Sequence, residues 1–599
     1  MSARFAVGID LGTTNSVVAY SPLQAAEAQV SVLSIPQLVA PGQVELLDHL
    51  PSFLYLPAES TILESARIFD TGEVDSVIVG TYARRVSAEQ PERTVAAAKS
   101  WLCHPHVDRR SPILPWDASD DVSKISPVEA STIYLRHLVR TWDQQFPDSQ
   151  LAQQQVVLTV PASFDVVARE LTREAAILAG LPEDFVLLEE PQAALYHWIL
   201  NVGEQWRKYI ARGDVILVCD VGGGTTDLTL VVVDETSGEL QLQRQAVGNH
   251  LLVGGDNMDL ALAHFAASRF AERNIKLNPW QSVSLWHSCR AAKESLLSEQ
   301  AIDPQTISIL GRGSRLIGGT QSIEVSRAEA TSLLIDGFFP KCDLSERANR
   351  NVQSGFQELG LPFESDSGIT RHIASFLTDS LPDSSTLGKI KLLFNGGVFK
   401  SPAFRNRLME TMASWANDGG SPSVLGGPED LDRAVASGAA FYAWTKQHGG
   451  LRIRGGAARS YYVGIETAGL AVPGMPRPLQ ALCVVPLGME EGTEIEVPSK
   501  QVGLVVGQPA RFRFFSSSVR NADQPGTMLR FIDEEELQET AALELALSVE
   551  ETPDEGFIPV RFHSKITELG VFELWCHSIR DDRKWKLEFD IREASNASS

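Results

Sequence analysis

Two aspartates, each followed at once by a turn of glycine and threonine, are the residues whose types and spacing point most clearly to chemistry. Residues 10–16 read DLGTTNS, and residues 220–227 read DVGGGTTD. Glycine lets backbone N–H groups approach a phosphate without a Cβ in the way, and threonine hydroxyls supply further donors. The two stretches therefore predict a pair of phosphate-binding loops that grip one nucleotide from two sides.

Each loop is predicted to be the tip of a hairpin. Residues 5–9 and 215–219 are apolar runs typical of buried strands, and residues 17–20 and 228–233 return to a strand pattern after the turns. A P-loop would need the G-x-x-x-x-G-K-[ST] pattern and a following helix, and neither occurs. A single Gly-Gly-Gly-Thr turn is more often an ordinary hairpin, but two such loops, each introduced by a strand and an aspartate, make coincidence a poor explanation.

The aspartates that open the loops, Asp10 and Asp220, are candidates for a metal site. Mg²⁺ sheds water reluctantly and is usually met by one or two carboxylates together with substrate phosphates. We therefore expect these two residues to hold a hydrated Mg²⁺ that the phosphates carry.

The elements around the loops follow the alternating rhythm of an α/β domain. Residues 156–160, 185–188 and 390–394 read as strands, and residues 166–179 read as a helix closed by Gly180. Ser401 is a plausible N-cap for a helix that starts at Pro402 and runs to about Glu410. Residues 432–440 are rich in alanine and glycine, so a helix there could pack closely on a neighbouring strand.

The amino-acid composition changes near residue 447, where a glycine-rich and basic stretch is typical of a linker. Beyond it, short segments with β-branched and aromatic residues alternate with turn residues, which favours a β-sandwich. Residues 533–547, rich in Glu, Leu and Ala, fit either a helix or a charged edge strand. The expected domains are residues 1–446, a linker at 447–460, and a β-rich unit at 461–599.

Composition narrows the classes of function. The chain has 599 residues and a formal net charge of −24, and no stripe of Lys and Arg could neutralise a nucleic acid. No apolar run approaches the length of a membrane helix, and the N-terminus has no signal-peptide pattern, so we expect a cytoplasmic protein without membrane or nucleic-acid partners. The six cysteines are widely spaced and are expected to be reduced, and Cys219 is expected to be a small buried strand residue.

With these motifs in order, residues 4–445 resemble the DnaK-type, seventy-kilodalton heat-shock chaperones of the actin and sugar-kinase superfamily. The stretches that carry the resemblance are the two loops, VPA at 160–162, EPQAA at 190–194, GGD at 254–256 and the glycine pair at 396–397. The resemblance implies an α/β, actin-like (ribonuclease-H-like), two-lobed ATPase domain, followed by a mainly β, sandwich-like domain that lacks the family's helical lid.

The resemblance also assigns roles to single residues. Lys99 would help to position the attacking water, and Glu190 would couple nucleotide to domain movement, with Pro161 and Arg169 as a relay. Thr225 and Asp227 would orient the water or the γ-phosphate. The residues implied to bind ATP or ADP are Gly12, Thr13, Thr14, Asn15, Gly222, Gly223, Gly224, Thr225, Gly255, Lys293, Ser298, Gly396, Gly397 and Asp432.

The nucleoside side departs from the family pattern. Arg290 stands where the family typically has a glutamate for the ribose, and Glu294 where some members place a stacking arginine. The family's serine would fall at Leu297 or, with a shift of one residue, at Ser298. Val398 and Lys400 replace the usual serine and arginine. These changes predict weaker or less selective nucleotide binding.

Three hypotheses about function follow from the sequence. The leading one is a slow, chaperone-like ATPase that uses Mg²⁺ and binds unfolded or client polypeptide, for which the resemblance implies a J-domain co-chaperone and a nucleotide exchange factor. A small-molecule kinase of the same superfamily would need the same loops but usually adds a carboxylate base for a sugar hydroxyl. The third is a nucleotide-bound scaffold with little hydrolysis.

Overall fold

The structure of the protein is a computed structural model. It describes residues 3–58, 68, 77–87, 89–104, 107–116, 118, 121–236, 239–298, 302–309, 321–349, 361, 363–381, 384–416, 420–426, 430–449, 453–454, 456–457, 459–466, 479–490, 492–499, 502–505, 509–520, 522–533, 536–540, 543–546, 557–567 and 572–589.

The N-terminal part contains two sheets built on the same plan. In the first sheet β1 pairs antiparallel with β2 and parallel with β10, and in the second β12 pairs antiparallel with β13 and parallel with β17. The orders are β11-β10-β1-β2-β3, with β6 on β2, and β18-β17-β12-β13-β14-β19. The strands are β1 (Phe5–Leu11), β2 (Asn15–Pro22), β3 (Ser31–Val32), β6 (Leu50–Pro51), β10 (Gln155–Val160), β11 (Val186–Glu189), β12 (Val215–Val221), β13 (Thr226–Thr236), β14 (Glu239–Val247), β17 (Ile390–Asn395), β18 (Ser423–Val424) and β19 (Ile453–Arg454).

The predicted hairpins are confirmed by the strand registers. Leu11 pairs with Ser16 across the first turn, and Val221 pairs with Thr226 across the second. Each opening aspartate is the sixth residue of its seven-residue strand. Both phosphate-loop candidates are therefore held by a rigid sheet at the end of a central strand.

Two helices, α5 (Glu190–Val202) and α12 (Ala434–His448), pack between the sheets. One hydrophobic cluster contains Ala193, Val435 and Ala439 from these helices together with Val157 of the first sheet and Ile216 of the second. Small residues permit the close approach, as expected for residues 432–440. A Cβ on Gly438 would lie only 1.8 Å from the Ala193 carbonyl oxygen. This helix pair therefore fixes the distance between the two sheets.

We expect the substitution Gly438→Ala to destabilise the protein by about 1–3 kcal/mol, because the new methyl meets backbone atoms that cannot rotate away. The matched control is Gly337→Ala, in α9 (Arg327–Phe338), where no atom lies within 4 Å of the added Cβ. That change should leave the stability unchanged or raise it by up to about 1 kcal/mol. Urea unfolding followed by circular dichroism measures both; equal stability of the two variants would contradict the close packing.

Helix ends are encoded locally where a capping residue is present. The helix α4 (Val166–Ala179) has the predicted bounds, since the Asp165 carboxylate accepts from the Ala168 N–H at 2.7 Å and Gly180 takes a left-handed conformation with φ 102°. The helix α11 (Pro402–Trp415) starts as predicted but runs beyond Glu410. Its N-cap Ser401 makes no side-chain capping bond. No glycine or proline follows Glu410 directly, so the helix continues to Trp415, whose side chain is buried.

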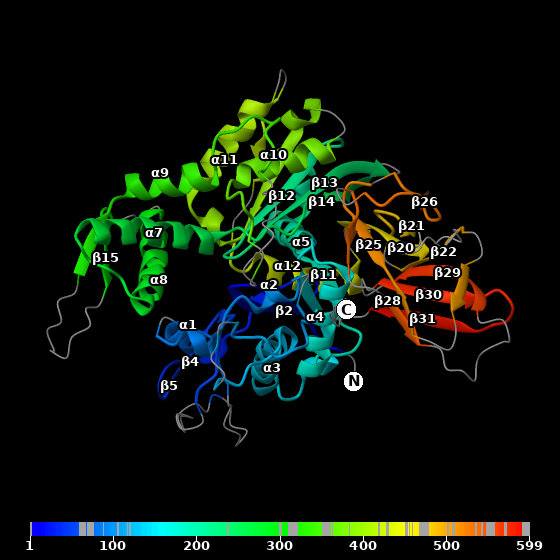
Figure 1. Cartoon of the computed structure of the whole chain (residues 1–599), viewed down its shortest axis with the longest axis horizontal. Helices are drawn as coiled ribbons and strands as arrows, with labels where there is room; N and C mark the ends of the chain where they lie inside the picture. Colours follow the sequence, from blue (N-terminus) through cyan, green and yellow to red (C-terminus); the bar gives the residue numbers. More distant parts are fainter. Residues whose placement is uncertain are drawn as a thin grey trace, which may run out of the picture.

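Further elements cover the sheets (Figure 1). The first sheet is covered by α3, and α7, α8 and α9 form an arm with the hairpin β15-β16 in the green part of the figure. The elements are β4 (Ile35–Ala40), β5 (Gln43–Leu47), β7 (Leu54–Tyr55), β8 (Ile78–Val79), α1 (Thr81–Val86), β9 (Thr94–Val95), α2 (Ala98–Trp101), α3 (Pro127–Gln145), α6 (Trp206–Tyr209), α7 (Gly255–Glu272), α8 (Pro279–Leu296), β15 (Gln305–Ile309), β16 (Gln321–Val325) and α10 (Ile369–Ser380).

The glycine-rich stretch after α12 contains a strand of the second sheet. β19 pairs in parallel with β14, with Ile453 opposite Leu242. The Ile453 side chain is buried, and its backbone N–H donates to the Tyr196 hydroxyl at 2.9 Å. Despite its basic composition, this segment is therefore anchored to the N-terminal part.

The C-terminal region consists of two sheets that share one core, in agreement with the predicted β-rich unit. Val463 and Leu482 of one sheet lie in the same cluster as Phe562 and Leu574 of the other. Residues 533–547 are not helical where described. The sheets are built from β20 (Ser460–Glu466), β21 (Leu479–Val485), β25 (Phe514–Ser517), β26 (Met528–Leu529) and β27 (Gln538–Glu539), and from β22 (Thr493–Glu496), β23 (Val502–Val505), β24 (Pro509–Phe512), β28 (Leu543–Ala546), β29 (Phe557–Ile566), β30 (Phe572–Ser578) and β31 (Lys584–Phe589).

The core of the C-terminal region also takes in one residue of the N-terminal part. Val166, the first residue of α4, belongs to the cluster that contains Tyr461 and Val463.

In the part of the chain that the structure describes, no helix has the length and apolar character needed to cross a membrane. All six cysteines are unpaired, and Cys219 is a buried strand residue as expected.

Candidate functional site

A cavity of about 570 Å³ lies between the two sheets and takes in nearly every residue that the sequence singled out. Its size is within the usual range for a small-molecule site. Of the predicted residues, the following line it: Asp10, Gly12, Thr13, Thr14, Asn15, Lys99, Glu190, Asp220, Gly222, Gly223, Thr225, Asp227, Gly255, Lys293, Ser298, Gly396, Gly397 and Asp432. Gly224 is not among the lining residues.

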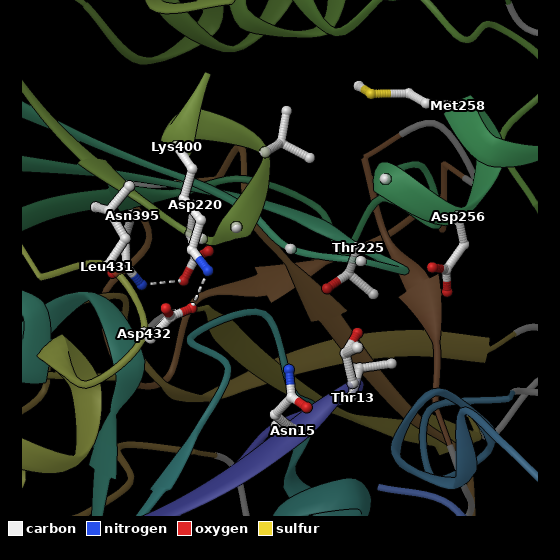
Figure 2. Close-up of a pocket in the computed structure, with 18 of the residues that line it drawn as sticks. Thr13, Asn15, Asp220, Thr225, Asp256, Met258, Asn395, Lys400, Leu431 and Asp432 are labelled. Carbon is white, nitrogen blue, oxygen red and sulfur yellow. Dashed lines mark hydrogen bonds and ion pairs between the residues drawn. The ribbon is translucent and has the colours of Figure 1, made fainter. Parts of the chain in front are cut away.

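The two loops face each other across this cavity, as Thr13 and Thr225 do in Figure 2. They also touch, because a Cβ on Gly223 would lie 2.2 Å from Thr14 Oγ1, and one on Gly224 would lie 3.2 Å from Thr13 Cγ2. The fold therefore places the two loops on opposite sides of one cavity, as a two-sided grip on a nucleotide would require. Gly224 belongs to it as a contact between the loops.

The second loop is held from behind by the N-terminus of α7. The backbone N–H of Gly255 donates to the Gly222 carbonyl at 3.0 Å, and that of Asp256 donates to the Gly223 carbonyl at 2.7 Å. Gly254 lies so close to the loop that a Cβ there would be 2.6 Å from the Gly223 oxygen. These contacts fix the loop carbonyls and thereby the position of the loop beside the cavity.

Lys99 forms a buried ion pair with Glu190 between the two loops. Lys99 lies on α2, and its Nζ is 2.5 Å from Glu190 Oε1 at the start of α5. Burial disfavours the charged amine, but Glu190, Asp10 and Asp227 outweigh it, so the pKa of Lys99 is raised. Lys99 is therefore a fixed cation surrounded by three carboxylates.

The opening aspartates are poor acids in this environment. Burial and the nearby Glu190 raise the pKa of Asp10 to about 7, although Lys99 and Thr159 act in the opposite direction. Burial and Glu190 likewise raise the pKa of Asp220 to about 8, against a hydrogen bond of 2.6 Å from Asn395 Nδ2. The negative charge of the carboxylates in the site thus exceeds the positive charge of Lys99.

This excess of buried carboxylate fits a divalent cation. Among the described residues, no three Asp, Glu, His or Cys side chains converge closely enough to ligate an ion directly. A Mg²⁺ between Asp10 and Asp220 would therefore keep water and phosphate as most of its ligands, as is usual for this ion. Gly396 leaves space for the ion beside Asp220, because a Cβ at position 396 would lie 2.6 Å from Asp220 Oδ1.

We expect the affinity for magnesium-ADP to rise with pH. Asp10 and Asp220 carry protons below pH values of about 7 and 8, and each must lose its proton to face a cation. Between pH 6.5 and 8.5 the affinity should rise roughly tenfold to a hundredfold. Calorimetry in two buffers of different ionisation enthalpy would also detect the released protons. ADP titrated in EDTA is the control, and an affinity independent of pH would contradict the assignment.

The nucleoside end holds a compact charge cluster. Arg290 Nε donates to Asp259 Oδ2 at 2.7 Å, Arg290 also pairs with Asp256, and Lys293 Nζ lies 2.6 Å from Asp259 Oδ1. The Arg290 guanidinium lies 5.3 Å from the centre of the Trp286 ring. The arginine that replaces the expected glutamate is therefore already bound by the protein's own carboxylates.

A second ion pair lies on the opposite side of the nucleoside end of the cavity. Lys400 Nζ lies 2.6 Å from Asp432 Oδ1, and the two residues meet in Figure 2. Leu297 and Ser298, the two alternatives for the family's serine, both line the cavity. A base that enters here would contact an apolar wall formed by Val398, Phe404 and Leu431.

The predicted relay residue Arg169 links two segments beside the site. Its guanidinium donates to the Ala162 and Phe164 carbonyls at 3.3 and 3.2 Å, and to Glu189 Oε1 at 2.7 Å. Glu189 also pairs with Arg244. Arg169 therefore ties the segment after Pro161 to the residue that precedes Glu190.

Several residues that complete the site were not predicted from the sequence: Thr159, Ser163, Glu189, Arg244, His250, Asp256, Asp259 and Asn395. Two of them carried a signal: Asn395 directly precedes the predicted glycine pair at the end of a strand, and Asp256 closes the GGD stretch at 254–256. The others meet the motifs through tertiary contacts between distant segments.

These features define a two-sided nucleotide site between paired sheets. The sequence model described as "Hsp70 protein" matches residues 69–343, so this part of the chain is similar to the Hsp70 family. The match implies the two-lobed, actin-like fold of that family. The nucleotide-site motifs on either side of residues 69–343 are present as well, at Asp10 and at Gly396.

Curated relatives support the same family. The chain is 30% identical to a "Chaperone protein HscA homolog" of Histophilus somni over 345 residues, which are 55% of this chain and 46% of the relative. It is 32% identical to one of Pasteurella multocida over 288 residues, 46% and 39% of the two chains. For one of Pseudomonas aeruginosa the identity is 31%, with 55% and 46% covered. The matched part spans less than half the length of these relatives.

Proposed function

We propose that this protein is a chaperone-like ATPase in which nucleotide controls how the C-terminal β domain binds unfolded polypeptide. The observation that supports this most is the Lys99–Glu190 ion pair between two facing phosphate loops. We assign residues 1–446 to the ATPase domain, 447–460 to the linker and 461–599 to the polypeptide-binding domain. By the resemblance, a J-domain co-chaperone and a nucleotide exchange factor would act on it.

Hydrolysis would use water as the nucleophile. The water oxygen forms a bond to the γ-phosphorus while the bond to the β–γ bridging oxygen breaks, which gives ADP and phosphate. The loop N–H groups and Lys99 stabilise the charge on the transferred group. Asp227, with Thr225 beside it on the second loop, orients the water and accepts its proton. A bound Mg²⁺, held through Asp10 and Asp220, would neutralise phosphate charge.

Two contacts support coupling to the β domain. β19 anchors the linker in the sheet of the second loop, and Val166 at the start of α4 packs in the core of the C-terminal region. Arg169, one turn further along α4, holds Glu189 next to the catalytic Glu190. A change in Glu190 therefore has a short structural path to the surface on which the β domain rests.

Single-turnover ATP hydrolysis, with and without an unfolded polypeptide, tests the proposal. We expect slow turnover that rises in the presence of polypeptide, and polypeptide release that differs between ATP and ADP. Phosphate transfer to a sugar in a substrate panel would instead identify a kinase. Nucleotide binding without turnover would favour the nucleotide-bound scaffold, for which the sequestration of Arg290 by Asp256 and Asp259 is the supporting observation.

A further inference from the structure

Behind Asp227 lies a histidine that none of the recognised motifs includes. His250 follows β14, and its Nδ1 lies 2.9 Å from Ser163 Oγ and 3.3 Å from Asp227 Oδ1. Ser163 lies before α4 and donates its hydroxyl proton to Asp227 Oδ1. Ser163 and His250 are not among the residues that line the nucleotide cavity, whereas Asp227 is. Both therefore act on the nucleotide only through Asp227.

The contacts determine which ring nitrogen of His250 carries a proton. The Ser163 hydroxyl is used as a donor to Asp227, so Ser163 must accept from His250, and this requires a proton on Nδ1. His250 Nε2 is buried and has no hydrogen-bond partner among the described residues. The ring is held by an edge contact with Phe164, at 5.8 Å between centroids. The chain of donors runs from His250 through Ser163 to Asp227.

We propose that His250 is a positioning residue, which through Ser163 fixes the orientation of Asp227 and sets its basicity according to whether the imidazole is neutral or protonated. This inference rests on the proposed ATPase function, because it assigns Asp227 the role of proton acceptor. The neutral imidazole with its proton on Nδ1 orients the carboxylate without adding charge. The imidazolium places a positive charge beside Asp227 and makes it a weaker base.

The charges around the cluster support the conclusion that a positive charge on His250 makes Asp227 a weaker base. Burial alone would raise the pKa of Asp227, but His250, Ser163 and Lys99 together hold it below its ordinary value. The groups that surround the cluster from the other elements are Lys99 on α2, Cys103 after α2, and Asp220, which pairs with Asp227 across the hairpin; Asp165 and Arg109 lie beside Cys103. Lys99 is paired with Glu190.

The test is the pH profile of single-turnover hydrolysis at saturating magnesium-ATP for the full chain and for His250→Asn. The asparagine amide replaces the Nδ1–H donor but does not titrate. Between pH 7.5 and 5.5, we expect the rate of the unaltered protein to fall about tenfold more than that of the variant, while the two agree within about threefold at pH 8. The comparison cancels the titration of Asp10 and Asp220, which both proteins share.

Two further variants separate positioning from a general effect of mutation. His250→Phe keeps the ring but removes the donor, so it should lower the rate about tenfold even at pH 8, and ADP affinity should stay unchanged. His264→Asn, an exposed histidine on α7, should keep the profile of the unaltered protein. Superimposable profiles for the unaltered protein and His250→Asn would overturn this inference alone. Absence of turnover in the unaltered protein would overturn the proposed function and the inference with it.

Discussion

Replacement of Lys99 by methionine is expected to lower the rate of single-turnover ATP hydrolysis about 10²–10³-fold, the usual loss when one fixed charge-stabilising group is removed from an active site. Methionine keeps the length of the apolar stem but removes the cation that Glu190, Asp10 and Asp227 surround. The affinity for magnesium-ADP should change much less than the rate, because the loop glycines and threonines remain. Quench-flow with radiolabelled ATP measures the rate, and calorimetry measures the affinity.

Loss of Lys99 also leaves the buried Glu190 without its partner, so stability has to be separated from catalysis. Breaking a buried pair from one side typically costs about 3–5 kcal/mol, whereas replacing both partners with apolar residues is often nearly neutral. The double variant Lys99→Met, Glu190→Met should therefore regain stability but not turnover. Lys208→Met, on exposed surface of α6, is the matched control. Turnover within about threefold of the unaltered protein in Lys99→Met would contradict the assignment.

The part of the site that sequence predicts well is the part that is local in the chain. An apolar strand, an aspartate and a glycine turn are consecutive, so the hairpins at Asp10 and Asp220 can be read from the residues alone. The same holds for α4, where Asp165 and Gly180 mark both ends. Each of these features has its physical cause within a few residues of itself.

The features that sequence did not predict depend on segments that meet only in the folded chain. Arg290 looks like a loss of ribose recognition in the sequence, but the fold places Asp256 and Asp259 of α7 against it. His250 is an isolated histidine in a loop until β13 and the start of α4 bring Asp227 and Ser163 beside it. Residues 533–547 fit either a helix or a charged edge strand by sequence, and residues 543–546 form a strand with β24 on one side and β31 on the other. In each case a tertiary contact overrides or completes the local pattern.

The same distinction explains the linker. Its basic and glycine-rich composition indicates an exposed connection, but Ile453 has a buried side chain and pairs with Leu242 of β14. Two residues are enough because the edge of β14 offers unpaired backbone groups to any extended segment. Composition therefore describes this stretch poorly, because the pairing of Ile453 and Arg454 with β14 fixes its position in the fold.

Gly254, which lies between α7 and the second phosphate loop, is expected to be as sensitive to substitution as Lys99, but with its effect on nucleotide binding. In Gly254→Ala the new Cβ would lie 2.6 Å from the Gly223 oxygen and 2.8 Å from the Gly222 oxygen, so the loop or α7 must shift. These are backbone atoms, which no side-chain rotation can move aside. A misplacement of about 1 Å in a site of this kind costs about 10²-fold in rate, and we expect a loss of at least tenfold in ATP affinity.

The adjacent glycine is the matched control for this prediction. In Gly255→Ala the added Cβ would meet Lys293 Nζ and Val398 Cγ2 at 3.4 Å, and both are ends of side chains that can yield. The Gly255 N–H that holds the Gly222 carbonyl is kept. Affinity of Gly255→Ala for ATP should therefore stay within about threefold of the unaltered protein. Equal losses in the two variants would show that α7 does not set the position of the loop, and that the loop is held by its own hairpin instead.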